Sequence, residues 1–232
     1  MSGRLAVDEV CKINKMIKLS KRLSAAANLV RQGRTLADIG CDHGYVPVSL
    51  VLNGKINSAV ASDINEGPLN SCINLVKEYE LEDKIKCVLS NGLEKINLDK
   101  VDDILIAGMG GQLIAEILSS CSFEELKTKH VILNPMTHPE DARRYLFENG
   151  FEIKNDIIVK DGKHYYSVFD AVYTGKLKDF SNSDLFIGKI EIREENKGYF
   201  IHLLNYLKNK QKSGENFEEV ISLIEEKIND NC

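Results

Sequence analysis

The sequence lacks several features that mark whole classes of protein. Its 232 residues contain no run of about 18 apolar residues, so we expect no transmembrane helix. The opening stretch, MSGRLAVDEVCKINK, has acidic residues and no long apolar segment, so a secretory signal is not expected. Repeats and low-complexity tracts are also lacking. These absences, with an ordinary apolar content of 43%, favour a globular cytoplasmic protein.

Paired cysteines are also lacking. The six cysteines are scattered, and no two form a C-x-x-C pair. This spacing predicts reduced thiols in a cytosolic protein and argues against a structural zinc site. We therefore expect no metal.

Charge is unevenly distributed along the chain. The net charge is −5, which at first disfavours a nucleic-acid partner. The first 34 residues, however, carry eight Lys or Arg and only two Asp or Glu, a net charge of +6. A local basic surface is what phosphate binding requires, whatever the total charge. A solvated helix face explains the same pattern equally well.

Strand-like and helix-like segments alternate through the middle of the chain. The strand-like runs cover residues 35–40, 56–64, 84–90, 102–108 and 130–135. Helical patterns follow them from about Val46, from Pro68, briefly after Gly92, from Gly111, and over 138–150. Two β-rich runs around Asp161-Gly162 predict a terminal hairpin. Five β-α units followed by a hairpin predict a doubly wound, mostly parallel α/β sheet.

The two ends of the chain have helical patterns. Residues 11–33 have apolar residues at helical spacing and lysines on the other side. After Gly175, two apolar stripes, around Leu203 and around Ile221, predict a C-terminal helical hairpin. We therefore predict a doubly wound α/β domain over residues 1–176 with a basic N-terminal helix, and a helical hairpin domain over 177–232.

The loop after the first strand, Gly40-Cys41-Asp42-His43-Gly44, is a candidate nucleotide site, because ligands of doubly wound sheets bind at the carboxyl ends of the strands. It lacks the G-x-G-x-x-G spacing of dinucleotide sites. Asp38 and Asp42 add carboxylates that would repel a pyrophosphate. They suit a ligand with a cationic end, such as S-adenosylmethionine (SAM). A helix-capping loop is the alternative interpretation.

The next two strand ends extend this candidate site. Asp63 follows the glycine turn by about twenty residues, the position of a carboxylate that binds both ribose hydroxyls. NAD and SAM sites share this feature, so it does not separate them. Asn91 and Gly92 follow the third strand, where an amide could contact the adenine of the cofactor; an ordinary turn explains them nearly as well.

The fourth strand ends where the reactive end of the cofactor lies in doubly wound methyltransferases, but it lacks the box of the exocyclic-amine class. Ala107, Gly108 and Met109 begin a glycine-rich turn whose backbone can approach a ligand closely. The N/D-P-P-aromatic box of exocyclic-amine methyltransferases is missing at this strand. Asn134-Pro135 looks like that box but comes one strand later.

Taken together, these motifs resemble a known family. The stretch 36–50, EGP (66–68), IAGMGG (106–111), LNPM (133–136), LSKRL (19–23) and DGKHYY (161–166) resemble the bacterial TrmK-type tRNA (adenine-N1)-methyltransferases. The resemblance implies a Rossmann-like class I SAM-dependent methyltransferase domain with a C-terminal helical, coiled-coil-like domain. It also implies methylation of N1 of adenine 22 in the D-loop of tRNA.

The motifs and the resemblance together predict a role for each candidate residue. The predicted cofactor residues are Asp38, Gly40, Asp42, His43, Gly44, Asp63, Asn91, Gly92, Ala107, Gly108 and Met109. Asn134 is the predicted positioning residue for the target base, with a buried structural Asn as the alternative. No general base is named, because adenine N1 has an in-plane lone pair. Lys15, Lys18 and Arg22 are the predicted tRNA contacts.

Three other functions stay open on the sequence alone. The chain could be a SAM-dependent methyltransferase of a protein or small molecule, which its acidic body permits. An NAD(P) oxidoreductase is disfavoured by the loop chemistry. A non-catalytic RNA-binding or scaffold protein would use the helical tail for dimerisation.

Overall fold

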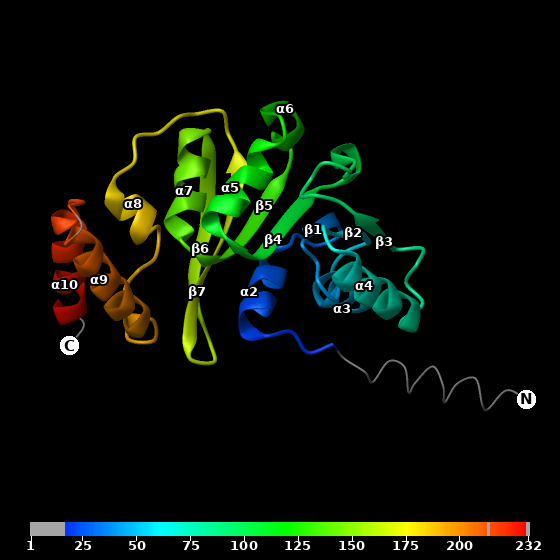
Figure 1. The fold of residues 1–232 in the computed structure, drawn as a ribbon, viewed down its shortest axis with the longest axis horizontal. Helices are drawn as coiled ribbons and strands as arrows, with labels where there is room; N and C mark the ends of the chain where they lie inside the picture. The colour runs from blue at the N-terminus through cyan, green and yellow to red at the C-terminus, as the bar shows by residue number, and fades with distance from the viewer. Residues whose placement is uncertain (1–16, 213, 231–232) are drawn as a thin grey trace, which may run out of the picture. The chain divides into compact units, whose positions relative to one another are not determined.

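The fold is described by a computed structural model that covers residues 17–212 and 214–230. The chain divides into two compact units, residues 1–105 and 106–232, and the boundary falls inside strand β4 (Asp103–Gly110). The strand order in the sheet is β3-β2-β1-β4-β5-β7-β6 (Figure 1). The prediction of an α/β sheet with a terminal hairpin is confirmed.

The first unit contains the first three of the five predicted β-α strands. Its elements are α2 (Lys21–Leu29), β1 (Thr35–Ile39), α3 (Tyr45–Leu52), β2 (Ser58–Asp63), α4 (Glu66–Glu78), β3 (Ile85–Leu89) and the 3-10 turn η1 (Leu98–Lys100). Strand β1 pairs in parallel with β2, and β2 with β3. The carboxyl ends of these three strands therefore lie at one edge of the sheet.

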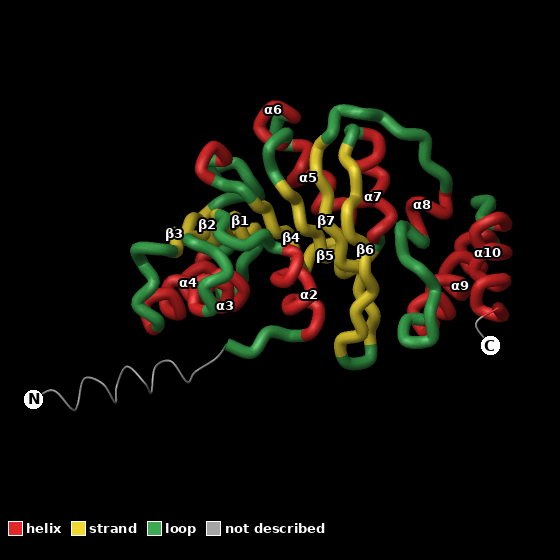
Figure 2. Tube along the Cα trace, turned by 180° about the vertical axis from the view of Figure 1, so that it is seen from behind, coloured by secondary structure: helices red, strands yellow, loops and turns green. Residues whose placement is uncertain are grey.

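The second unit carries the antiparallel hairpin and the C-terminal helices. Its elements after β4 are α5 (Gly111–Ser119), α6 (Phe123–Leu126), β5 (His130–Thr137), α7 (Pro139–Glu148), β6 (Phe151–Asp161), β7 (His164–Tyr173), α8 (Asn182–Phe186), α9 (Lys197–Gln211) and α10 (Glu218–Asp230). Strand β7 lies between β5 and β6 and is antiparallel to both. Figure 2 shows β6 and β7 running side by side to their turn.

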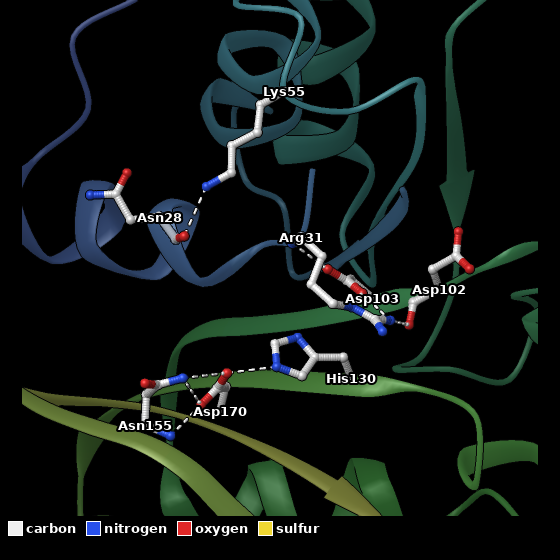
Figure 3. Close-up of polar contacts among 8 residues, drawn as sticks. All are labelled: Asn28, Arg31, Lys55, Asp102, Asp103, His130, Asn155 and Asp170. Carbon is white, nitrogen blue, oxygen red and sulfur yellow. Dashed lines mark hydrogen bonds and ion pairs between the residues drawn. The ribbon is translucent and has the colours of Figure 1, made fainter. Parts of the chain in front are cut away.

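A buried polar group ties these three strands together. Asp170 of β7 lies 2.6 Å from Nε2 of His130 on β5 and accepts from the backbone N–H of Asn155 on β6 at 2.6 Å (Figure 3). Burial alone raises the pKa of the Asp170 carboxyl, but the hydrogen bonds from His130 and Asn155 lower it overall. The charged carboxylate therefore joins all three strands of the hairpin region.

The C-terminal helices bury a common apolar core. Its members include Phe186 of α8, Phe200, Leu203 and Leu207 of α9, and Ile224 of α10. The predicted helical pattern after Gly175 is present, with α8 as an additional short helix that the sequence reading did not anticipate. The domain boundary at 176/177 stays a prediction.

Two predicted helices are wrong in extent. The N-terminal helix does not run through residues 17–20: α2 begins at Lys21, where the Ser20 side chain accepts a hydrogen bond from the N–H of Leu23. A serine at this position competes with helix continuation and caps the helix that follows. The short helix expected after Gly92 is a turn, held by the Ser90 hydroxyl, which donates to Gly92 O and accepts from Lys95 N–H.

The described residues allow three further statements. None of their helices is long and apolar enough to cross a membrane. They contain no group of three or more His, Cys, Asp or Glu side chains that could hold a metal ion. Four of the cysteines fall in this part of the chain as free thiols: Cys41, Cys72, Cys87 and Cys121.

Candidate functional site

The loop after β1 has an unusual backbone. Gly40, Asp42 and Gly44 all have left-handed φ angles, at +72°, +51° and +71°. The N–H groups of Gly40 and Cys41 both donate to Ser62 O at 2.8 Å, which fixes the loop to β2. A left-handed aspartate is uncommon and costs about 1–3 kcal/mol, and such strain clusters at functional sites.

Gly44 is required by its surroundings as well as by its φ angle. It caps the N-terminus of α3, and a Cβ atom at this position would lie 2.3 Å from Sγ of Cys72. Helix α4 therefore approaches the start of α3 closely enough to exclude any side chain there. The tight turn leaves the first N–H groups of α3 at the same edge as the loop.

Asp63 joins the ends of β1 and β2. Its Oδ2 accepts from the N–H of Asp42 at 3.2 Å, and its Oδ1 accepts from the N–H of Asn65 at 2.9 Å. The residue is only 8% exposed. Two backbone donors thus orient the carboxylate, and each oxygen keeps a lone pair for another donor.

Asp38 is a second buried carboxyl group of this unit. It is 4% exposed on β1, and burial, with Asp63 as a second cause, raises its pKa to about 7. A carboxyl group that titrates near neutrality beside a ligand loop is a functional-site feature. Any cationic group that binds nearby would favour its ionised form.

Two other predicted cofactor residues of the first unit are exposed and locally bonded. Asn91 donates from its amide to Oε1 of Glu94 at 2.7 Å. His43 lies with Nε2 3.6 Å from Oδ1 of Asp42, and its ring packs on Tyr45 at 5.3 Å between centroids. Their roles toward a cofactor stay predictions.

The glycine turn after β4 belongs to the second unit. Gly108 has a φ of +85°, and a Cβ atom there would meet no atom within 4 Å. At Gly111 a Cβ atom would lie 1.9 Å from His138 O. The turn that includes Ala107 and Met109 is therefore open on one side and packed against the end of β5 on the other.

Asn134 is deeply placed on β5. It has no exposed surface, and its Nδ2 donates to the Ser167 carbonyl on β7 at 3.0 Å. This bond is the structural role that the sequence left open, and the positioning role stays a prediction. Pro135 is also buried, and the chain becomes accessible from Met136, which is 37% exposed.

A large pocket opens in the second unit beyond Asn134, which we call the aromatic pocket. Its volume is about 710 Å³, within the usual range for ligand sites. Its wall consists of the end of β5, the β6–β7 turn and helix α9, and includes Met136, His138, Glu140, Tyr165, Tyr199 and Tyr206. Four residues of the DGKHYY motif, 163–166, line it as well.

His138, Glu140 and Tyr206 form a hydrogen-bonded group in this wall. Tyr206 OH donates to Oε1 of Glu140 at 3.0 Å, and His138 Nδ1 lies 3.3 Å from the same oxygen. His138 has a left-handed φ of +51° and precedes Pro139, which begins α7. Burial and the Glu140 carboxylate raise the pKa of the Tyr206 hydroxyl, so it stays a donor.

Sequence reasoning missed this group. An acidic residue in the first turn of a helix is usually a solvated charge that complements the helix dipole, so Glu140 gave no signal of burial. Tyr206 lies 66 residues away, in the predicted C-terminal helical hairpin. The DGKHYY motif is the one local signal near this group, because its residues 163–166 line the same pocket.

The structure describes two of the three predicted tRNA contacts. Lys15 lies outside the described residues. Lys18 is exposed in the segment before α2, and Arg22 is half-buried within α2, so the two do not lie on one helix.

Helix α2 itself is firmly attached to the first unit. Lys55 Nζ donates to the carbonyls of Ala27 and Asn28 at 2.8 Å each, and Figure 3 shows the bond to Asn28. Arg31 donates through its backbone N–H and its Nε to the fully buried carboxylate of Asp103, at 2.7 Å in both cases. The basic segment before α2 therefore continues into a helix that is held in place on the first unit.

Known proteins share both the sequence and the fold. Residues 19–169 match the protein family described as "Methyltransferase domain". The tRNA (adenine(22)-N(1))-methyltransferase of Bacillus subtilis (strain 168) is 36% identical over 166 residues, which span 68% of this chain and 70% of that protein. The chain belongs to the TrmK-type tRNA (adenine(22)-N1)-methyltransferase family.

Solved structures of this family extend the similarity to the helical tail. The crystal structure of the B. subtilis m1A22 tRNA methyltransferase TrmK has a TM-score of 0.77 at 28% identity, over 92% of this chain and 95% of that one. The M. capricolum TrmK in complex with S-adenosylhomocysteine has a TM-score of 0.73 at 28% identity, over 91% and 95%. The predicted Rossmann-like class I methyltransferase fold and the predicted family are confirmed.

Proposed function

We propose that this chain is a SAM-dependent methyltransferase that modifies N1 of adenine 22 in tRNA. The observation that carries the proposal is the paired strand end, where Asp63 binds the N–H of Asp42 within a left-handed loop. Family membership supports both the cofactor and the target.

The residues of the first unit fit SAM better than a dinucleotide. Three carboxyl groups, Asp38, Asp42 and Asp63, lie in or next to the loop, and a pyrophosphate would be repelled there. An ammonium group would be attracted, and Asp63 has the lone pairs to accept from ribose hydroxyls. When bound, SAM supplies a methyl group on a positively charged sulfur.

The other predicted cofactor residues are part of the proposal. Gly40, His43 and Gly44 would shape the loop around the amino acid end, and Asn91 and Gly92 would face the adenine. The open backbone at Gly108, with Ala107 and Met109 beside it, supports close approach of a ligand to this turn. A separate helical domain from residue 177 onward and an RNA-binding role for Lys15, Lys18 and Arg22 are further parts of the proposal.

The chain's own contribution to the reaction is mainly positional. Adenine N1 has an in-plane lone pair, so its attack on a methyl group requires no strong base. Extraction of the base from its stack and exclusion of water are the main tasks, and orientation alone supplies about 7–11 kcal/mol of barrier reduction. Asn134 is proposed to orient the base edge from its buried position on β5.

A methylation assay tests the proposal directly. The full chain is incubated with labelled SAM and unmodified tRNA, and the modified base is mapped. We expect one 1-methyladenosine at position 22 and no label in tRNA with guanine at that position. Label in protein or small molecules only would favour the alternative methyltransferase class, and SAM binding without turnover would favour a non-catalytic RNA-binding protein.

A further inference from the structure

The aromatic pocket combines ring faces with a buried charge. Tyr165 lies 6.5 Å from Tyr199 and 6.1 Å from His202 between ring centroids, and His138 lies 6.3 Å from Tyr206. Unpaired RNA bases are held by stacking on such rings. Ring faces also attract cations through their quadrupole.

Glu140 places a negative charge in the wall of this pocket. It is 5% exposed and lines the cavity, with Tyr206 OH donating to its Oε1. A carboxylate is costly to bury unless a cation or strong donors compensate it. Tyr206 supplies one such donor, and the half-exposed imidazole of His138 lies beside the same oxygen.

Arg143, the buried cation nearest to Glu140 in the sequence, forms its ion pair with a different acid. Arg143 of α7 has no exposed surface and pairs with Asp156 of β6 at 3.0 Å. It also donates to Leu185 O and to Ser167 Oγ. Glu140 acts on Arg143 electrostatically, and the formal charges of Arg143, Asp156 and Glu140 sum to −1. The exposed Lys163 also lines the pocket, so the buried negative charge belongs to the Glu140 side of its wall.

The pocket adjoins the glycine turn of the same unit. Thr137 and His138 line the aromatic pocket, and both also line a second hollow shared with Gly110 and Gly111. A Cβ atom at Gly110 would lie 3.2 Å from Thr137 Oγ1. The aromatic pocket therefore opens beside the end of β4, where the reactive end of the cofactor is expected.

Methylation at N1 changes the charge of adenine. The neutral base gives its N1 lone pair to the methyl carbon as the carbon–sulfur bond breaks, so the positive charge moves from sulfur to the purine. A site with fixed negative charge and ring faces stabilises this charge as it develops. Such a site binds the cationic product more tightly than the neutral substrate.

We propose that the aromatic pocket holds the target adenine and that Glu140 is the counter-ion of the positive charge that methylation places on it. The inference rests on the proposed function. It adds where the substrate base binds and which side chain balances the charge of the methylated base. Glu140 stabilises the charged base, and the Tyr206 hydroxyl and His138 position its carboxylate.

The test compares adenosine with 1-methyladenosine, which is a cation at neutral pH. Binding of each nucleoside is measured on the full chain saturated with S-adenosylhomocysteine, so that the cofactor site is blocked. We expect the wild type to prefer 1-methyladenosine by about 10-fold or more, the range for a hydrogen bond to a charged group. Glu140→Gln, which keeps shape and removes charge, should abolish this preference and leave adenosine affinity within about twofold.

Two further variants control the result. Glu148→Gln changes an exposed acid of the same helix outside the pocket and should keep the preference. Tyr206→Phe keeps the ring, removes one donor to Glu140, and should reduce the preference only in part. Melting temperature and S-adenosylhomocysteine affinity confirm that each variant is folded.

Kinetics with tRNA separate this inference from the proposed function. Glu140→Gln should lower kcat by about 10-fold while KM for tRNA stays within about twofold. Normal methylation of adenine 22 with an unchanged nucleoside preference in Glu140→Gln would overturn the pocket assignment and leave the proposed function intact. A wild type that methylates another position, or no RNA, would instead overturn the proposed function.

Discussion

The carboxylate of Asp63 accepts a hydrogen bond from the backbone N–H of Asp42 at 3.2 Å. This contact joins the ends of the parallel strands β1 and β2. It does so through the loop after β1, in which Asp42 has a left-handed φ. Because the N–H of Asn65 binds the other oxygen, the carboxylate is held from both sides before any ligand arrives. A carboxylate oriented in this way is preorganised for donors such as ribose hydroxyls.

The first prediction concerns Asp63. Asp63→Ala should weaken SAM binding about 10- to 100-fold, because charge-assisted hydrogen bonds contribute roughly 1.5–3 kcal/mol each before water compensates. Calorimetric titration with S-adenosylhomocysteine measures the change. The loop should also loosen, because the N–H of Asp42 loses its acceptor.

Asp83→Ala is the matched control, since it removes an exposed carboxylate from a turn of the same unit. It should leave affinity unchanged. Equal affinities for wild type and Asp63→Ala, with normal melting of both, would show that Asp63 is not the ribose ligand.

The second prediction concerns the pH dependence set by Asp38. Its pKa is raised to about 7 in the fold by burial and by Asp63, against 3.8 for an unperturbed carboxyl. The unfolded chain therefore releases this proton first as pH rises. Stability should fall from about pH 4 to pH 7, with the whole loss, on the order of 4 kcal/mol at most, present above pH 7.

Asp38→Asn isolates this effect. The variant cannot ionise, so its cofactor-free melting temperature should exceed that of the wild type at pH 8 and match it near pH 4. The same change should weaken SAM binding at pH 8, where the wild-type carboxylate attracts the ammonium group. A wild-type advantage in melting temperature at pH 8 would contradict the raised pKa.

The strand ends of the first unit were predictable because their determinants are local. A buried run that ends in Asp38-Ile39-Gly40 marks both the strand and the turn, and Asp63 follows at the spacing of a β-α-β unit. The parallel pairing that brings Asp63 to the loop is a general consequence of this topology. Its hydrogen bond to the N–H of Asp42 was not predictable, because it depends on the left-handed φ of Asp42.

The aromatic pocket was not predictable, because its determinants are far apart in the sequence. Its wall joins Glu140, Tyr165 and Tyr206, which come from three elements far apart in the sequence. Each residue has a local pattern that fits a solvated or core position. The start of α2 was also misjudged, because lysines at helical spacing continue through Lys18 although Ser20 ends the pattern by capping.

The third prediction tests the close packing at Gly44. Gly44→Ala should destabilise the protein by about 2–4 kcal/mol, because a left-handed φ of +71° strains alanine and its Cβ would meet Cys72 Sγ at 2.3 Å. Gly54→Ala shares the left-handed φ but would meet no atom within 4 Å, so it should cost only about 1 kcal/mol. Chemical denaturation measures both changes.

A double variant identifies the clash. Cys72→Ala removes the sulfur, so the cost of Gly44→Ala should be smaller in that background by about 1 kcal/mol or more. Strictly additive costs would show that backbone strain alone, without contact between α4 and the start of α3, accounts for the effect.

The fourth prediction tests the RNA role of the basic segment. Lys18 is exposed just before α2, and Arg22 lies in its first turn, while Lys55 and Arg31 fix the other end of the helix to the unit. Lysine and arginine contacts to phosphate release counterions, so each lost contact lowers the salt slope of log K by about 0.7–0.9. The variant with Lys18→Ala and Arg22→Ala should therefore bind tRNA more weakly, with a flatter salt dependence, and bind S-adenosylhomocysteine normally.

The control for this variant is Lys84→Ala, a change of an exposed lysine between α4 and β3 of the same unit. It alters the net charge without touching the segment before α2, so tRNA affinity measured from 50 to 200 mM salt should follow the wild type. Arg22→Ala alone separates two roles: a larger loss in kcat than in tRNA affinity would place Arg22 at the reacting base instead of on the phosphates. Wild-type affinity and salt slope in the double variant would exclude this segment as the RNA surface. The next candidates would be Lys208, Lys210 and Lys212, at and just after the end of α9, with Lys208 already paired to Glu225 at 2.6 Å.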